Sequence, residues 1–264
     1  MTTSKGIDSY KLKITALIFM VIDHIYTYLN APIHGYQTDG MWPQWIQLLA
    51  RFVSPLFLYL MIEGFYHTRS RRKFLTRLLT TGLIMMGGNM LINYIFHNAD
   101  PSTGMYSFRS LIEGHDIFLT LADLFAFVWC LDNIRQKKRV GLCILIAVIT
   151  AFLCLFLEGG FYLLPITVIF WYFHGKKPQQ CIGIGVWTAV LLIHALISYL
   201  GGDAGCSLYS HLCFDNEWAM LPVIFFILMY NGERGRNTKL TKYMFYVIYP
   251  LHLWILMIIR FILV

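Results

Sequence analysis

Residues 12–29 read LKITALIFMVIDHIYTYL, an apolar run that is long enough to cross a lipid bilayer as a helix. Similar runs follow along the 264-residue chain, in which 58% of residues are apolar and 13% are charged. That charged share is about half of the usual one, and a water-soluble fold could not bury so much apolar surface. The composition therefore indicates an integral membrane protein. It excludes a disordered chain, a disulfide-rich secreted scaffold and a cytosolic enzyme.

The apolar runs predict an all-α, polytopic transmembrane helix bundle that forms a single domain over residues 1–264. We expect nine spans, at residues 12–29, 46–66, 78–96, 114–131, 140–157, 160–174, 181–200, 218–230 and 242–263. The sixth and eighth runs are short for complete crossings. No small-residue cleavage site accompanies the first run, so we expect a retained helix rather than a signal peptide.

Basic residues in the connections test this order of spans. Of the 21 Lys and Arg residues, 18 lie on alternate connections, as expected for loops that stay in the cytoplasm. The N-terminus is therefore predicted to lie inside and the C-terminus outside. Topology also explains the net charge of +7, so the expected partner is the lipid bilayer and not nucleic acid. An oligomer is compatible with the sequence.

Two of the six cysteines, Cys206 and Cys213, share one predicted outer loop. An oxidising exterior permits a disulfide between them, and two free thiols are the alternative. No cysteine pair has zinc-site spacing with histidine support, so we expect no metal site.

Lys13 and His24 are the first candidate functional pair. They are eleven positions apart, which places them about 20° apart on one helix face and about 16 Å apart along the axis. A cation at the inner mouth and an imidazole deeper on the same wall would suit a long anionic ligand, with its reactive end at the histidine. The alternatives are that Lys13 extends to the membrane surface and that His24 is a hydrogen-bonded packing residue.

The fourth predicted span adds acidic groups. Asp116, Thr120 and Asp123 recur there at helical spacing. We interpret most asparagines, serines and threonines in the spans as contacts between helices. Asp23 points about 100° away from its neighbour His24, so Asp123 or Asp116 is the better candidate for orienting the imidazole.

Three segments resemble the TraX family. They are Lys11–His24, residues 63–68 (EGFYHT) with the basic stretch that ends at Arg77, and residues 243–253 (YMFYVIYPLHL). A basic residue, ten intervening residues and a histidine are also similar to the signature of the wider membrane-bound acyltransferase superfamily. TraX acetylates the N-terminus of conjugative pilin, so the resemblance implies an acetyltransferase with a catalytic His24 and a paired basic Lys13. Asp116 departs from the family pattern, in which an asparagine is expected.

The leading hypothesis is a multi-pass acetyltransferase of the bacterial cytoplasmic membrane. It would move acetyl from cytoplasmic acetyl-CoA, the donor substrate, to an amine or hydroxyl acceptor at the outer side or within the membrane, such as a pilin, a peptide or a glycan. The expected catalytic residues are His24, Asp123 and Asp116. The residues expected to bind the phosphates of acetyl-CoA are Lys13, Arg71, Arg72, Lys73 and Arg77.

Two other classes of protein fit parts of the pattern. A proton-coupled transporter would also place Asp and His inside the membrane, although the inverted repeat that transporters often carry is not visible. A non-catalytic membrane assembly factor would use the polar side chains only to hold helices together. Binding and turnover of acetyl-CoA would separate these two classes from the enzyme.

Overall fold

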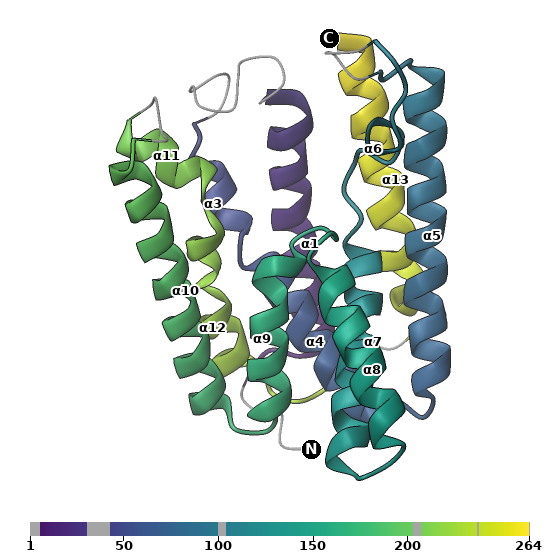
Figure 1. Cartoon of the computed structure of the whole chain (residues 1–264), viewed down its shortest axis with the longest axis vertical. Coiled ribbons are helices and arrows are strands. Elements are labelled where there is room, and N and C mark those ends of the chain that lie inside the picture. Colours follow the sequence, from purple (N-terminus) through teal and green to yellow (C-terminus); the bar gives the residue numbers. More distant parts are fainter. Residues whose placement is uncertain (1–5, 31–42, 100–103, 203–206, 237, 264) are drawn as a thin grey trace. The chain divides into compact units, whose positions relative to one another are not determined.

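The structure is a computed structural model that describes residues 6–30, 43–99, 104–202, 207–236 and 238–263 (Figure 1). In these ranges the regular elements are helices, and a single parallel bridge joins Ile7 to Tyr230. The all-helical class predicted from the sequence is therefore confirmed for the described part of the chain.

The helices follow the predicted spans closely. In chain order they are α1 (Ser9–Ile25) with the π-helix η1 (Tyr26–Asn30), α3 (Ile46–Ala50), α4 (Val53–His67), α5 (Arg71–Ile95), α6 (Phe108–Leu111), α7 (Ile117–Arg135), α8 (Val140–Cys154), α9 (Gly160–Tyr172), α10 (Lys177–Leu200), α11 (Leu208–Phe214), η2 (Glu217–Met220), α12 (Val223–Met229) and α13 (Lys239–Leu263).

The number of complete membrane crossings differs from the number of predicted spans. Within the described ranges, six helical segments are long and apolar enough to cross a bilayer, and the pair 208–214 and 217–229, bent by 58°, would be a seventh. α8 and α9 have 15 and 13 residues and extend about 22 Å and 20 Å, less than the roughly 30 Å of a hydrocarbon core. The multi-pass architecture is confirmed among the described residues, but nine complete crossings are not, and the sidedness stays a prediction.

The chain divides into two compact units. Unit 1 comprises residues 1–60, 168–245 and 264, and unit 2 comprises residues 61–167 and 246–263. Their boundaries fall inside α4, α9 and α13, so three continuous helices belong partly to each unit. A single domain over residues 1–264 stays a prediction.

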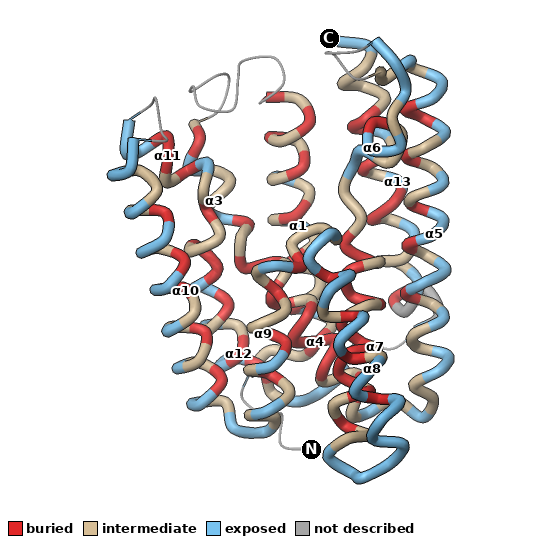
Figure 2. Tube along the Cα trace, in the orientation of Figure 1, coloured by how far each residue is buried: buried red, intermediate tan, exposed pale blue. Residues whose placement is uncertain are grey.

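α7 forms the centre of unit 2, where it packs against both α5 and α8. Most of its residues are buried, and Phe125 contacts the rings of Phe65 and Phe74 at 5.2 and 4.9 Å between centroids. α5 and α8 instead contain many exposed residues (Figure 2). Apolar side chains such as Leu83 and Val148 are among them. Such a surface is favourable in lipid, because lipid tails are as apolar as the side chains themselves.

Candidate functional site

The first candidate group lies on α1 in unit 1. Leu12, Ala16, Met20 and His24, spaced four residues apart, form the buried face of this helix. His24 is 6% exposed, so its imidazole is enclosed by protein and does not face lipid. Of the two residues predicted to share a face, His24 is buried and Lys13 is half-buried.

The helix changes its winding one residue after His24. α1 ends at Ile25, and the chain continues as the π-helix η1, in which Tyr26, Tyr28 and Asn30 are buried. π-helical turns are rare and occur frequently at functional sites, where they insert an extra residue into the turn. The change of winding therefore favours a functional role for this part of α1 over simple packing.

Lys13 lies near the beginning of α1. Among the residues that the structure describes, it forms no ion pair with a carboxylate; its Nζ lies 5.9 Å from the centre of the Phe245 ring. The charge of Arg234, another residue of unit 1, acts on Lys13. A cation that lies beside a second cation without an acidic partner is well suited to bind the phosphate groups of a ligand.

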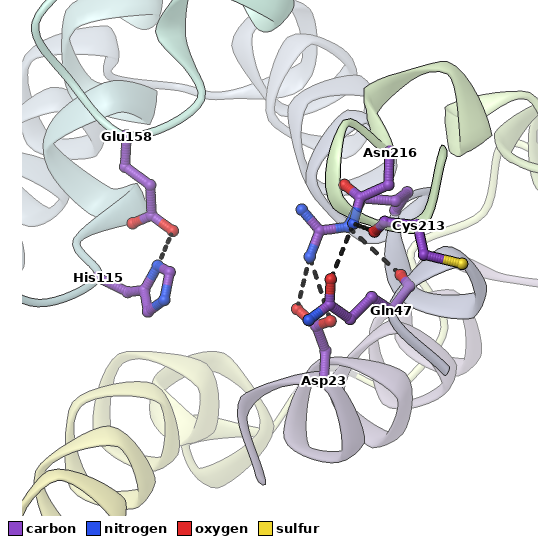
Figure 3. A network of polar contacts seen from close by, with 7 residues as sticks. Asp23, Gln47, His115, Glu158, Cys213 and Asn216 are labelled. Carbon is purple, nitrogen blue, oxygen red and sulfur yellow. Dashed lines mark hydrogen bonds and ion pairs between the residues drawn. The ribbon is translucent and has the colours of Figure 1, made fainter. Parts of the chain in front are cut away.

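A polar network fixes the other end of α1 (Figure 3). Both carboxylate oxygens of Asp23 accept hydrogen bonds from Nη2 of Arg51, at 3.1 and 3.0 Å. Arg51 also donates from Nε to the backbone oxygen of Gln47. The side chain of Asn216 donates to Oε1 of Gln47 and to the backbone oxygen of Cys213. The network joins α1 to the α3–α4 region and to the segment between α11 and η2.

The second candidate group lies in unit 2, on α7. Asp116 is the N-cap of this helix, and its Oδ1 accepts a hydrogen bond from the backbone nitrogen of Leu119 at 3.3 Å. Oδ2 of Asp116 and Oδ2 of Asp123 are buried and have no hydrogen-bond partner among the described residues. Asp123 interacts with the Cys154 thiol. The polar face predicted for this helix is therefore turned toward the end of α8.

The turn between α8 and α9 completes this group through Glu158. Its Oε1 lies 2.6 Å from Nδ1 of His115, and its Oε2 accepts a hydrogen bond from the backbone nitrogen of Asp116 (Figure 3). The Thr120 hydroxyl donates to the backbone oxygen of Glu158 at 2.8 Å. His115, Asp116, Thr120 and Glu158 are thus joined in one cluster, which we call the turn cluster.

The basic stretch at the start of α5 is only partly available to a ligand. Arg71 donates to Oδ2 of Asp132 at 2.7 Å, and its guanidinium lies 3.9 Å from the centre of the Phe65 ring. This geometry assigns Arg71 a structural role in unit 2. The three other cations of this stretch are Arg72 and Lys73, which are exposed, and Arg77, which is half-buried.

The predicted site residues fall in both units. Lys13 and His24 share α1 in unit 1, whereas the other predicted residues belong to unit 2, namely Asp116, Asp123, Arg71, Arg72, Lys73 and Arg77. Asp116 and Asp123 are brought to one face of α7, but orientation of His24 by either acid stays a prediction. Cys206 lies outside the described residues, so its disulfide with Cys213 also stays a prediction.

Arg51, His115 and Glu158 belong to these clusters but were not among the predicted site residues. Glu158 had a visible signal in the sequence, because it is the single charged residue between Val140 and Phe173. Its partner is 43 positions away, and no local pattern connects the two. Arg51 could have been assigned from the rule that a cation in a span needs a partner.

Comparisons with known proteins agree with this architecture. A protein of Dichelobacter nodosus named "Probable fimbrial assembly protein FimC, serogroup H1" is 26% identical over 258 residues, which cover 96% of each chain. No solved structure matches the chain. The model of the TraX protein family matches residues 9–260. This match spans both units and nearly the whole sequence, and the chain therefore belongs to the TraX family.

Proposed function

We propose that the protein is a membrane acetyltransferase that moves acetyl from acetyl-CoA to an acceptor on the opposite side of a bacterial cytoplasmic membrane. The observation that supports this most is the α1 face. It carries an enclosed imidazole, His24, and a cation without an acidic partner among the described residues, Lys13, about 16 Å apart along the helix. Membership of the TraX family supports the same function.

In this proposal the diphosphate of acetyl-CoA binds at Lys13 and Arg234, and the thioester reaches His24. The imidazole takes the proton from an acceptor amine or hydroxyl as that group attacks the thioester carbonyl. The new C–N or C–O bond replaces the C–S bond, and the departing thiolate of CoA takes up the proton. Asp123 or Asp116 remains the proposed acid that orients His24.

The acceptor is proposed to lie at the outer side. The 18 basic residues on alternate connections favour a cytoplasmic start for α1, so His24 lies deeper than a soluble cytoplasmic acceptor easily reaches. A pilin, a peptide and a glycan all offer a suitable amine or hydroxyl. Similarity to a protein named for fimbrial assembly favours a fimbrial subunit among them.

The direct test uses purified protein in sealed vesicles of known orientation, with radiolabelled acetyl-CoA on one side. We expect turnover only when acetyl-CoA is on the side of the basic connections, and an acetylated product on or within the other side. Hydroxylamine then distinguishes the product, since it cleaves esters and leaves amides intact. Absence of both binding and turnover of acetyl-CoA would instead favour a proton-coupled transporter, for which the buried carboxylates of α7 would be the relay.

Substitution of Lys13 tests the donor site separately. Lys13→Ala is expected to weaken acetyl-CoA binding by about tenfold, because a charge-assisted hydrogen bond to phosphate contributes roughly 1.5–3 kcal/mol. Lys13→Arg keeps a cation and is expected to lose less affinity, although its geometry differs. Calorimetric titration of detergent-solubilised protein measures both. Equal affinities for the two variants would mean that Lys13 only anchors the helix at the membrane surface.

A further inference from the structure

The lengths and flanking charges of α8 and α9 indicate that the turn between them lies at membrane depth. α8 follows the basic segment 135–139, and α9 ends shortly before Lys176 and Lys177. Both helices are too short to reach across the roughly 30 Å core, so a chain that begins and ends on the basic side turns back inside the membrane. Leu155 and Phe156 at the turn are apolar and exposed, Phe156 to 73%, as expected for side chains that face lipid.

The turn itself is tightly closed. A Cβ atom at Gly160 would lie 1.8 Å from the backbone oxygen of Cys154, so no larger residue fits there without a shift of the backbone. The Cys154 thiol lies 3.6 Å from the backbone oxygen of Gly160. This closure holds Glu158, which lies inside the turn, at a fixed position relative to the ends of the two helices.

A second irregular segment reaches the same depth from the opposite side. α7 ends at the basic segment 135–139, and its first residue, Ile117, lies 15 residues from Asp132 near that end, or about 22 Å along the helix. His115 lies two residues before Ile117. Backbone groups inside a membrane need partners within the protein. Asn93, which is fully buried, supplies them by donating to the backbone oxygens of Leu111 and Glu113, at 2.8 Å each.

The conformation at Gly114 continues this support. Its φ of +135° is one that L side chains rarely adopt, and a Cβ atom there would lie 2.7 Å from Nδ2 of Asn89. The close packing of this glycine on α5 brings His115 to the start of α7. Asn93 lies 22 residues from Arg71, or about 33 Å along α5, so the buried amides and the glycine hold an irregular backbone at the far end of the crossing. Membrane proteins tolerate such a backbone where it lines a cavity or is buried in protein.

The exposed fractions of His115 and Glu158 distinguish a backbone that lines a cavity from one that is buried in protein. The side chains of His115 and Glu158 are 34% and 31% exposed, although they lie at the depth of the hydrocarbon core. Ionisable groups in contact with lipid are very costly, so such groups face either protein or a water-filled cavity. The exposed third of each side chain therefore faces water or a polar ligand.

We propose that His115 and Glu158 form an acceptor-binding subsite inside the membrane that opens to the side opposite the basic connections. Glu158 is the positioning residue: in the neutral form of the ring it holds the proton on Nδ1, which leaves the lone pair on Nε2. Nε2 of His115 accepts a hydrogen bond from an N–H or O–H group of the acceptor. The acceptor role rests on the proposed acetyl transfer, whereas the depth and the opening of the subsite do not.

Thiol labelling tests the depth and the opening without any acetyl donor. Glu158→Cys, in sealed vesicles, is expected to react with a charged, impermeant thiol reagent added on the outer side only. Phe156→Cys, two residues away and facing lipid, is the matched control and should stay unlabelled from either side. Lys137→Cys should react from the basic side only. Reaction of Glu158→Cys from the basic side, or no reaction at all, would overturn the proposal.

Nitrogen-15 NMR of histidine-labelled protein tests the role of the pair. The His115 signals, assigned by their loss in His115→Gln, should show a proton fixed on Nδ1, and Glu158→Gln should give a mixture of the two tautomers. Glycinamide and glycolamide, which differ only in an amine and a hydroxyl, are the acceptor probes. A shift of Nε2 with either probe supports the subsite and names its ligand class. No shift with either, or an unchanged tautomer in Glu158→Gln, would refute it.

Discussion

His24→Ala is expected to lower acetyl transfer from acetyl-CoA by roughly 10²–10⁴-fold, the usual contribution of a general base. The reason is the position of the imidazole, which is enclosed on the same helix face as Ala16 and Met20, two residues before a π-helical turn. Binding of acetyl-CoA should change little, because the phosphates bind near Lys13, about 16 Å away along α1. Turnover and calorimetric binding, measured on the same preparation, give the two quantities.

Two further variants separate catalysis from packing. Removal of a buried side chain leaves a cavity and can destabilise a protein by itself. His24→Gln retains much of the side-chain volume and a polar tip, yet it cannot accept a proton near neutral pH, so it should lose as much turnover as His24→Ala. Met20→Leu, one turn away on the same buried face, should retain turnover close to that of the unaltered protein. Near-normal turnover in both His24 variants would remove this histidine from the mechanism.

Hydropathy located the helices of the predicted spans, because each one must pair its backbone groups internally and present apolar side chains to lipid. It missed α6 and α11, which are short and lie outside those spans. The ends of the helices differ more from the predicted ends. The third span was predicted to begin at residue 78, but α5 begins at Arg71, where the side chain of Ser70 caps the backbone nitrogen of Lys73. The intervening charged residues lie beyond the apolar run, and apolarity does not report that they are helical.

Pairs of polar residues distant in sequence could not be predicted. Arg71 donates a hydrogen bond to Asp132, which lies 61 positions away in the sequence, and His115 contacts Glu158, which lies 43 positions away. In the sequence, each of these residues stands out as an ionisable group that needs a partner. However, the sequence offers several carboxylates as partners for Arg71 and for His115. Only the packing of α7 against α5 and α8 selects among them. Composition likewise could not distinguish α8 and α9 from complete spans. Both helices are apolar, and only their length differs from that of a crossing helix.

Arg51→Ala is expected to destabilise the protein by about 3 kcal/mol, the lower end of the cost of removing one partner from a buried ion pair. The lower end applies because the side chain of Arg51 is 28% exposed, while that of Asp23 is 13% exposed. The substitution leaves the carboxylate of Asp23 without its cation. Thermal unfolding in detergent should show a transition that is lower by about 6–12 °C, as expected for a chain of this size.

The double variant Asp23→Asn with Arg51→Gln distinguishes the charge from the packing. It removes both charges and keeps polar groups that can bond to each other, so it should recover much of the lost stability. Arg260→Ala is the matched control, since its ion pair with the half-exposed Glu113 spans 3.6 Å and should contribute less than about 1 kcal/mol. If the double variant is as unstable as Arg51→Ala, the loss of stability comes from lost packing and not from the unpaired charge. Because Asp23 adjoins His24, Arg51→Ala should also lower turnover per folded molecule, whereas Arg260→Ala should not.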